Sequence, residues 1–157
     1  MEMRIKTTRI KKPRRETKEK LLSFYNSSFP KSQWSADYLD SFFRKKNKGV
    51  CFLAKNKKEI LGFALGKIHR DDEDSMTLCA LYVDPSLRGG GHGGGLIRMF
   101  LAQAFESGLF KKAIIHYRDS NDLRIFYEKS GFGKHSIVGE YSNGEKKHQM
   151  EILKENS

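Results

Sequence analysis

The chain has 157 residues, and 30 Lys and Arg against 19 Asp and Glu give it a formal net charge of +11. This length is typical of one domain, residues 1–157, that can bury a substantial core. Two cysteines without a Cys-x-x-Cys pair exclude a disulfide framework and a zinc module. Short apolar runs and a basic start without an apolar signal segment exclude a membrane protein, so we expect a soluble cytoplasmic domain without metal.

The first third of the chain predicts a strand followed by two helices. Residues 3–10 alternate as a short edge strand, and Thr17 is suited to cap an amphipathic helix that ends before Pro30. Aromatic and apolar residues at helical spacing predict a second helix over residues 32–46. Its aromatic stripe, which includes Trp34 and Tyr38, is expected to pack into the core, and the alternative is that these two rings line an acceptor groove.

Strand periodicity begins after Gly49. Residues 50–54 and 60–68 predict a hairpin, and a polar, acidic loop over residues 70–74 leads to a third strand over residues 77–83. Cys79 on that strand is expected to be a small buried residue. These segments predict a β-sheet rather than a helical bundle.

A long helix and a further hairpin follow. Apolar residues from Leu96 to Phe105 share one helical stripe that ends at Gly108. Residues 113–117 predict a strand, and Asn121 is suited to cap a short helix over residues 123–129. Asn143-Gly144 favours a type I′ turn between two last strands. The order of elements therefore predicts one α/β domain.

The most informative segment is Arg88-Gly89-Gly90-Gly91-His92-Gly93-Gly94-Gly95, between a predicted strand and a predicted helix. At such a junction the N–H groups of the first helical turn favour an anion, and glycine lets a phosphate approach the backbone closely. A flexible linker is the alternative, and the strand before the segment and the amphipathic helix after it favour anion binding instead. The segment lacks the Gly-Lys-Ser/Thr of a Walker loop, and three antiparallel strands before it exclude a dinucleotide-binding βαβ unit.

Two motifs together resemble the GCN5-related N-acetyltransferase (GNAT) family. Val83-x-Pro85-x-x-Arg88-Gly89-x-Gly91-x-Gly93-x-x-Leu96 is similar to the family's acetyl-CoA motif, and Tyr117-Arg118-x-x-Asn121 with Phe126-Tyr127-Glu128-Lys129-x-Gly131-Phe132 is similar to its second motif. The second half resembles ribosomal-protein N-terminal alanine acetyltransferases. The resemblance implies one α/β domain, whose mixed, mostly antiparallel sheet of about seven strands is flanked by four helices.

The resemblance also implies a cosubstrate, acetyl-CoA. Its pyrophosphate would lie on the glycine segment, its pantetheine arm on the third strand beside a gap to the next strand, and Asn121 would touch that arm. The cofactor-binding residues implied in this way are Leu81, Tyr82, Val83, Arg88, Gly89, Gly90, Gly91, His92, Gly93, Gly94, Asn121 and Tyr127.

Two residues are implied as catalytic. Tyr127 occupies the family's tyrosine position near the coenzyme sulfur, where a phenol with a reference pKa of about 10 stays protonated and can donate to the leaving thiolate. His116 stands five residues before Asn121, where the alanine acetyltransferases have a glutamate, and an imidazole suits a base at neutral pH. Glu73 and Asp74, acting through water, are rival bases.

The resemblance leaves the acceptor open among a peptide N-terminus, a lysine, a polyamine and another small amine. The acidic loop of residues 71–74 favours a cationic acceptor, whereas the basic residues between positions 4 and 20 favour an acidic or ribosome-associated one. A homodimer is compatible with the sequence. Two other functions stay open here, namely a basic module that binds nucleic acid or the ribosome and a coenzyme-binding domain without catalysis.

Overall fold

The computed structural model describes residues 5–30, 33–87, 91–108, 110–120 and 123–154. Seven strands form one sheet in the order β1-β2-β3-β4-β5-β7-β6. All neighbours in it are antiparallel except the parallel pair β4 and β5. The strands are β1 (Lys6–Arg9), β2 (Val50–Asn56), β3 (Glu59–His69), β4 (Asp72–Val83), β5 (Lys112–Arg118), β6 (Gly133–Glu140) and β7 (Lys146–Leu153).

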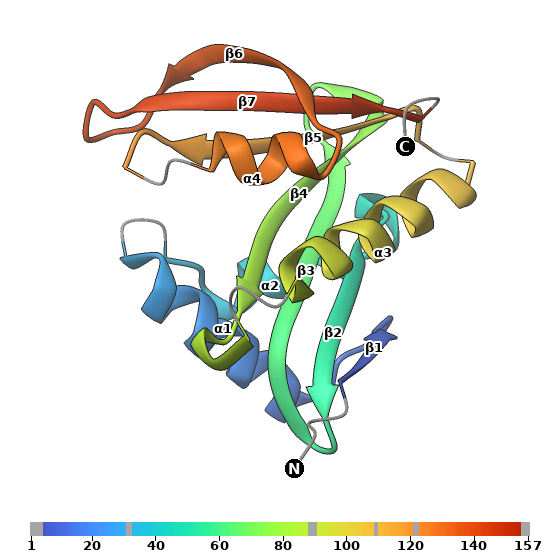
Figure 1. Cartoon of the computed structure of the whole chain (residues 1–157). Helices are drawn as coiled ribbons and strands as arrows, with labels where there is room; N and C mark the ends of the chain where they lie inside the picture. The colour runs from blue at the N-terminus through green and yellow to red at the C-terminus, as the bar shows by residue number, and fades with distance from the viewer. Residues whose placement is uncertain (1–4, 31–32, 88–90, 109, 121–122, 155–157) are drawn as a thin grey trace.

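Helices cover both faces of the sheet (Figure 1). On one face, α1 (Arg15–Ser28) contacts β4 and α2 (Ala36–Phe42) contacts β3. On the other face, α3 (His92–Glu106) crosses β2 to β5, and α4 (Arg124–Lys129) packs into the same apolar cluster as α3. The predicted fold class, with about seven strands and four helices, is confirmed.

The sheet separates two apolar clusters. The cluster under α3 and α4 contains Phe100, Ile115 and Tyr127, and the cluster under α1 and α2 contains Phe42 and Phe63. The middle strands β2 and β3 are buried on both faces for most of their length, which explains their nearly unbroken apolar sequence. α3 has its predicted apolar stripe, and Gly108, at φ +74°, follows its end.

Several predicted boundaries are wrong at their ends. The first helix begins at Arg15 rather than after a Thr17 cap, and it has no side-chain cap. The second helix is shorter than residues 32–46, because Ser35 caps it by accepting the N–H of Tyr38 and a separate 3₁₀ turn follows at Lys45–Asn47. The acidic segment 70–74 is not all loop, since β4 already begins at Asp72.

Two turns near the C-terminus also differ from the prediction. α4 is preceded by Leu123, without a side-chain cap, and Asn121 lies outside the described residues. In the last hairpin the N–H of Gly144 bonds the carbonyl of Tyr141, and Gly144 has φ +86° while Asn143 has a negative φ. The turn is therefore not type I′, which requires positive φ at both central residues.

Candidate active site

The two parallel strands at the centre of the sheet separate after four residue pairs. β4 and β5 pair only from Ser75 with Lys112 to Leu78 with Ile115, and beyond this point they diverge (Figure 1). A cavity of about 1520 Å³ occupies the opening, and its lining comes from both faces of the sheet. Tyr127 lines it on the α3 and α4 side, and Tyr25 lines it on the α1 side. The cavity therefore passes through the sheet.

A β-bulge turns β4 as it enters this opening. Leu65 pairs with Ala80 and Gly66 pairs with Leu78, so Cys79 is an extra residue without a partner on β3. Gly66 stands at this irregularity because a Cβ there would meet both the ring of Phe100 and a carbonyl of β4 at 2.4 Å. The glycine thus lets α3 and β4 approach β3 closely.

The bulge also reverses which face each β4 residue occupies. Leu78 belongs to the cluster under α3, but both Cys79 and Ala80 belong to the α1 side. Beyond the bulge, Leu81 and Val83 therefore face the α3 side, and the ring of Tyr82 faces α1. All three line the cavity, and their role along a pantetheine arm stays a prediction.

Cys79 itself is held away from reactive chemistry. Burial raises the pKa of its thiol to about 12, and its Sγ lies 3.6 Å from the carbonyl oxygen of Thr77. A thiol in this state is not a nucleophile at neutral pH. The sequence-based expectation of a small buried residue fits these contacts, although Cys79 also lines the cavity.

The N-terminus of α3 borders the same cavity. His92, Gly93 and Gly94 form the first turn of this helix, and Gly91 precedes it with φ +80°, which favours glycine. A Cβ on Gly93 would lie 3.3 Å from the ring of Phe126 and 3.4 Å from a methyl group of Val83. These four predicted cofactor-binding positions all line the cavity, while Arg88, Gly89, Gly90 and Asn121 lie outside the described residues.

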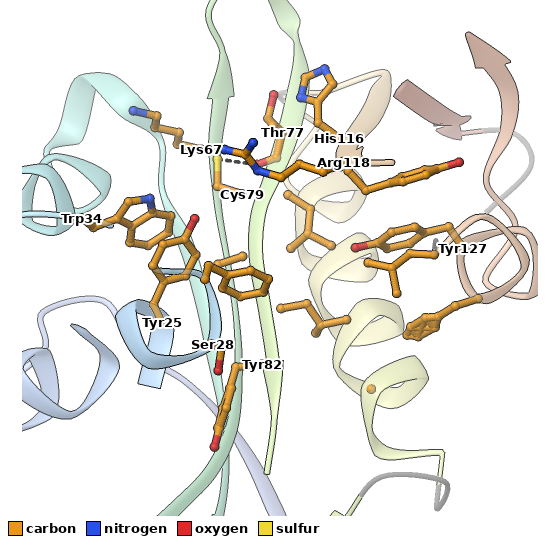
Figure 2. A pocket seen from close by; sticks show the side chains of 18 of the residues that line it. Tyr25, Ser28, Trp34, Lys67, Thr77, Cys79, Tyr82, His116, Arg118 and Tyr127 are labelled. Carbon is orange, nitrogen blue, oxygen red and sulfur yellow. Dashed lines mark hydrogen bonds between the residues drawn. The ribbon is translucent and has the colours of Figure 1, made fainter. Parts of the chain in front are cut away.

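Tyr127 reaches into the opening from α4 (Figure 2). It is only 7% exposed, and its ring lies 6.2 Å from that of Tyr117 and 5.3 Å from that of Phe126. Burial raises the pKa of Tyr127 to about 12, and the neighbouring Tyr117 adds to the rise. The hydroxyl therefore keeps its proton throughout the neutral range and acts as a hydrogen-bond donor.

His116 lines the cavity from the other face of the sheet. Its neighbour Tyr117 packs under α4, and alternation along β5 directs His116 to the α1 and α2 side. Its Nε2 lies 2.9 Å from Oε1 of Gln149 on β7. Burial lowers the pKa of His116, the Gln149 hydrogen bond opposes this, and Lys147 and His69 lower the pKa further. The imidazole is thus neutral at pH 7 and able to accept a proton.

The rival bases lie at the outer end of the cavity. Glu73 is exposed and lines it near the turn between β3 and β4, whereas the exposed Asp74 does not line it. A residue that sequence reasoning missed lies beside the predicted base: the ring of His69 is 6.2 Å from that of His116, and its Nδ1 is 2.7 Å from Oγ1 of Thr77. The sequence signal for His69 was its spacing of two residues from Lys67, which places both side chains on the same face of β3.

Aromatic side chains from both ends of the chain form the wall on the α1 and α2 side. Trp34 and Tyr38 line the cavity as well as packing, and the ring of Trp34 stacks 3.7 Å from that of Tyr25. Opposite them, Tyr141 from the last hairpin stacks on the guanidinium of Arg118 at 3.8 Å. Arg118 was not predicted as a site residue, because its proximity to Tyr141 depends on the fold, whereas Tyr141 falls within the last hairpin, residues 136–148, where the family resemblance implies the acceptor.

Part of the basic N-terminal cluster forms ion pairs within the chain. Two residues of the basic N-terminal cluster have carboxylate partners, Arg15 with Glu19 at 3.1 Å and Lys18 with Asp40 at 2.9 Å. Across the described ranges, no group of three His, Cys, Asp or Glu side chains could hold a metal ion. In the same part of the chain, no helix has the length and apolarity that crossing a membrane requires.

Comparisons with known proteins agree with this geometry. No curated protein sequence matches the chain. Among solved structures, the ribosomal-protein-S18-alanine N-acetyltransferase of Escherichia coli is 18% identical, with 94% of each chain covered and a TM-score of 0.69. Spermidine N-acetyltransferase of Vibrio cholerae, in complex with CoA and spermine, is 19% identical, with 97% of this chain and 96% of that chain covered and a TM-score of 0.73.

A third similar structure is Arabidopsis thaliana NAA60 in complex with a bisubstrate analogue. It is 15% identical, 96% of this chain and 98% of that chain are covered, and the TM-score is 0.77. At these identities the structures establish a common fold. The sequence model described as "Acetyltransferase (GNAT) family" matches residues 17–132, so the chain belongs to the GNAT acetyltransferase family.

Proposed function

We propose that this GNAT family member transfers acetyl from acetyl-CoA to a primary amine inside the cavity between β4 and β5, with Tyr127 and His116 as catalytic residues. Family membership makes the chain an acetyl-CoA-dependent N-acetyltransferase. The observation that carries the assignment of residues is the opening through the sheet, which Tyr127 lines from one face and His116 from the other. Such an opening brings a coenzyme and an amine together from opposite sides.

The coenzyme would occupy the side of α3 and α4. The pyrophosphate would lie at the N-terminus of α3, where free N–H groups and the helix dipole favour negative charge. The pantetheine arm would follow Leu81, Tyr82 and Val83 into the opening, and this places the thioester near Tyr127. The match between the cavity lining and the predicted cofactor-binding residues supports this path.

His116 would accept one proton from the acceptor ammonium. The amine nitrogen then attacks the acetyl carbonyl carbon, the C–N bond forms, and the C–S bond breaks with its electron pair on sulfur. The second proton of the nitrogen goes to the thiolate, and the proton on His116 is released to solvent, so the products are the amide, the free thiol and one proton. Because the phenol of Tyr127 is less acidic than an ordinary thiol, its contribution is a hydrogen bond that stabilises the departing sulfur.

The state of His116 favours an α-amine over a lysine as acceptor. Its lowered pKa makes it a weak base, so it removes a proton more readily from an α-ammonium, with a reference pKa of about 8, than from a lysine ammonium of about 10.4. The similar structures named for a ribosomal-protein alanine N-acetyltransferase and for a spermidine N-acetyltransferase leave both acceptor classes represented in this fold.

The test is thiol release from acetyl-CoA with a panel of amines, together with a thermal shift by acetyl-CoA. We expect acetyl-CoA to raise the melting temperature and at least one amine to release thiol. His116→Ala should reduce turnover with little change in the thermal shift. A shift without turnover on any amine would support a coenzyme-binding domain without catalysis, and the absence of a shift would overturn the coenzyme site.

A further inference from the structure

The acceptor side of the cavity carries more cations than carboxylates. Among the described residues that line the cavity, cationic side chains occupy five positions and carboxylates two. The cations are Lys46, Lys67, Arg70, Arg118 and Lys147, and the carboxylates are Asp71 and Glu73. Both carboxylates are exposed and lie with the exposed Arg70 at the turn between β3 and β4, at the outer end of the cavity, and Lys46 is exposed as well.

Within the described part of the chain only Arg118 of these five cations forms an ion pair, and two of the other four, Lys67 and Lys147, lie against aromatic rings. The Nζ of Lys67 lies 4.8 Å from the ring centre of Tyr38 and 4.9 Å from that of Phe42, and no ion pair of the described residues includes it. The Nζ of Lys147 lies 5.9 Å from the ring centre of Tyr141 and likewise forms no ion pair there. Both lysines are half-buried. A half-buried cation held against aromatic rings is a ready partner for an anion.

The sheet places these cations on either side of the predicted base. Lys147 on β7 pairs with Arg118 on β5. Arg118 lies two residues along β5 from His116, a separation of about 7 Å at the usual rise of a strand. Arg118 is anchored beside it by Glu145 at 3.2 Å. Lys67 on β3 pairs with Thr77 on β4, and Thr77 pairs with Ile114, two residues before His116 on β5, so the backbone of Lys67 is about 12 Å from that of His116.

We propose that the acceptor amine carries a carboxylate close to the nitrogen that receives the acetyl group, and that Lys147 and Lys67 bind this carboxylate. The inference rests on the proposed function and names the acceptor class of the same site. An α-carboxylate lies close enough to the amine to reach Lys147, and an acidic side chain one residue further along a peptide reaches further, toward Lys67. Polyamines are disfavoured, because their additional ammonium groups would meet these lysines.

The test compares acceptors that share an alanine α-amine and differ in charge. We would measure kcat/KM for alanine, alanine amide, Ala-Glu-amide, Ala-Gln-amide and Ala-Lys-amide, with spermidine as the polycation. At least one carboxylate acceptor should exceed its neutral partner by about tenfold, as expected for a charge-assisted hydrogen bond. Preference for alanine over its amide would identify the α-carboxylate, and preference for Ala-Glu-amide over Ala-Gln-amide would identify an acidic side chain.

Variants connect this preference to the lysines. Lys147→Met and Lys67→Met should each reduce the ratio of carboxylate to neutral acceptor, whereas Lys146→Met should preserve it. Lys146 is the matched control because it is the exposed neighbour on the same strand and does not line the cavity. Taking ratios within each variant cancels any effect of Lys147 on the pKa of His116.

The outcomes separate the two proposals. Turnover with no preference for carboxylate acceptors, or a preference for Ala-Lys-amide or spermidine, would overturn this inference and leave the acetyltransferase assignment intact. A preference for carboxylates that survives both lysine substitutions would overturn the assignment to Lys147 and Lys67. No turnover with any amine would instead overturn the proposed function on which the inference rests.

Discussion

Replacing Tyr127 by phenylalanine should reduce turnover by a bounded factor. The pKa of Tyr127 is about 12, whereas an ordinary thiol has a pKa of about 8.5. Complete transfer of the phenolic proton to the thiolate would therefore be uphill by about 5 kcal/mol, at 1.36 kcal/mol for each pKa unit. The hydroxyl is thus expected to contribute a hydrogen bond to a charged atom, worth about 1.5–3 kcal/mol. This corresponds to a decrease in kcat of roughly 10- to 150-fold.

The assay is steady-state thiol release at saturating acetyl-CoA, with coenzyme affinity measured separately by titration. Tyr117→Phe is the matched control, since it removes a hydroxyl from the same ring stack at 6.2 Å and should change kcat by less than about threefold. A Tyr127→Phe variant with unchanged kcat would show that another group stabilises the sulfur. A decrease beyond 10⁴-fold would show that Tyr127 transfers its proton fully, which would refute the argument from its pKa.

Three further predictions concern the base, the bulge and the loop. Activity requires neutral His116, and the hydrogen bond with Gln149 raises the pKa of this imidazole. Gln149→Leu should therefore lower that pKa and move the acidic limb of kcat/KM to lower pH, and an unmoved limb would exclude His116 as the base. Gly66→Ala should lower the free energy of unfolding, measured in urea, by about 3 kcal/mol, because the new Cβ would lie 2.4 Å from other atoms. Gly133→Ala, which has open space around its Cβ, should not lower it. Equal stabilities of the two variants would contradict the close approach of α3 and β4 to β3. Gly91→Glu should abolish acetyl-CoA binding, measured by calorimetry, because the carboxylate would repel the pyrophosphate. Gly91→Ala, which shares the backbone strain at φ +80°, should still bind. Equal affinities of the two variants would show that the pyrophosphate does not lie at this position.

Much of the fold could be predicted because its signals are local. The buried stripe of α3, the glycine after it and the apolar strands β2 and β3 each follow from spacing within one segment. Helix starts were less predictable, because Arg15 begins α1 without a capping side chain and Thr17 lies inside it. Tertiary packing, rather than a local cap, determines that boundary.

The site was predicted in part, through motif residues that happen to converge. Tyr127 and His116 come from short patterns, and the structure brings both to one cavity. The bulge at Cys79 could not be predicted, since simple alternation would have placed Tyr82 on the same face as Leu78. Lys147 joins the site only because β7 is inserted between β5 and β6, a feature of topology that no single segment encodes.

The separation of β4 and β5 has a consequence for the order of events in a catalytic cycle. If coenzyme and acceptor enter through opposite mouths of one passage, neither blocks the other's exit, and the two products can leave in either order. Steric exclusion at one mouth then does not affect the other, so the entry of a bulky protein acceptor would be restricted only at the mouth formed by α1, α2 and the last hairpin. The segment of the acceptor that carries the amine must still be narrow enough to pass through that mouth. The length of this segment, more than the overall size of the acceptor, then decides whether the molecule is a substrate.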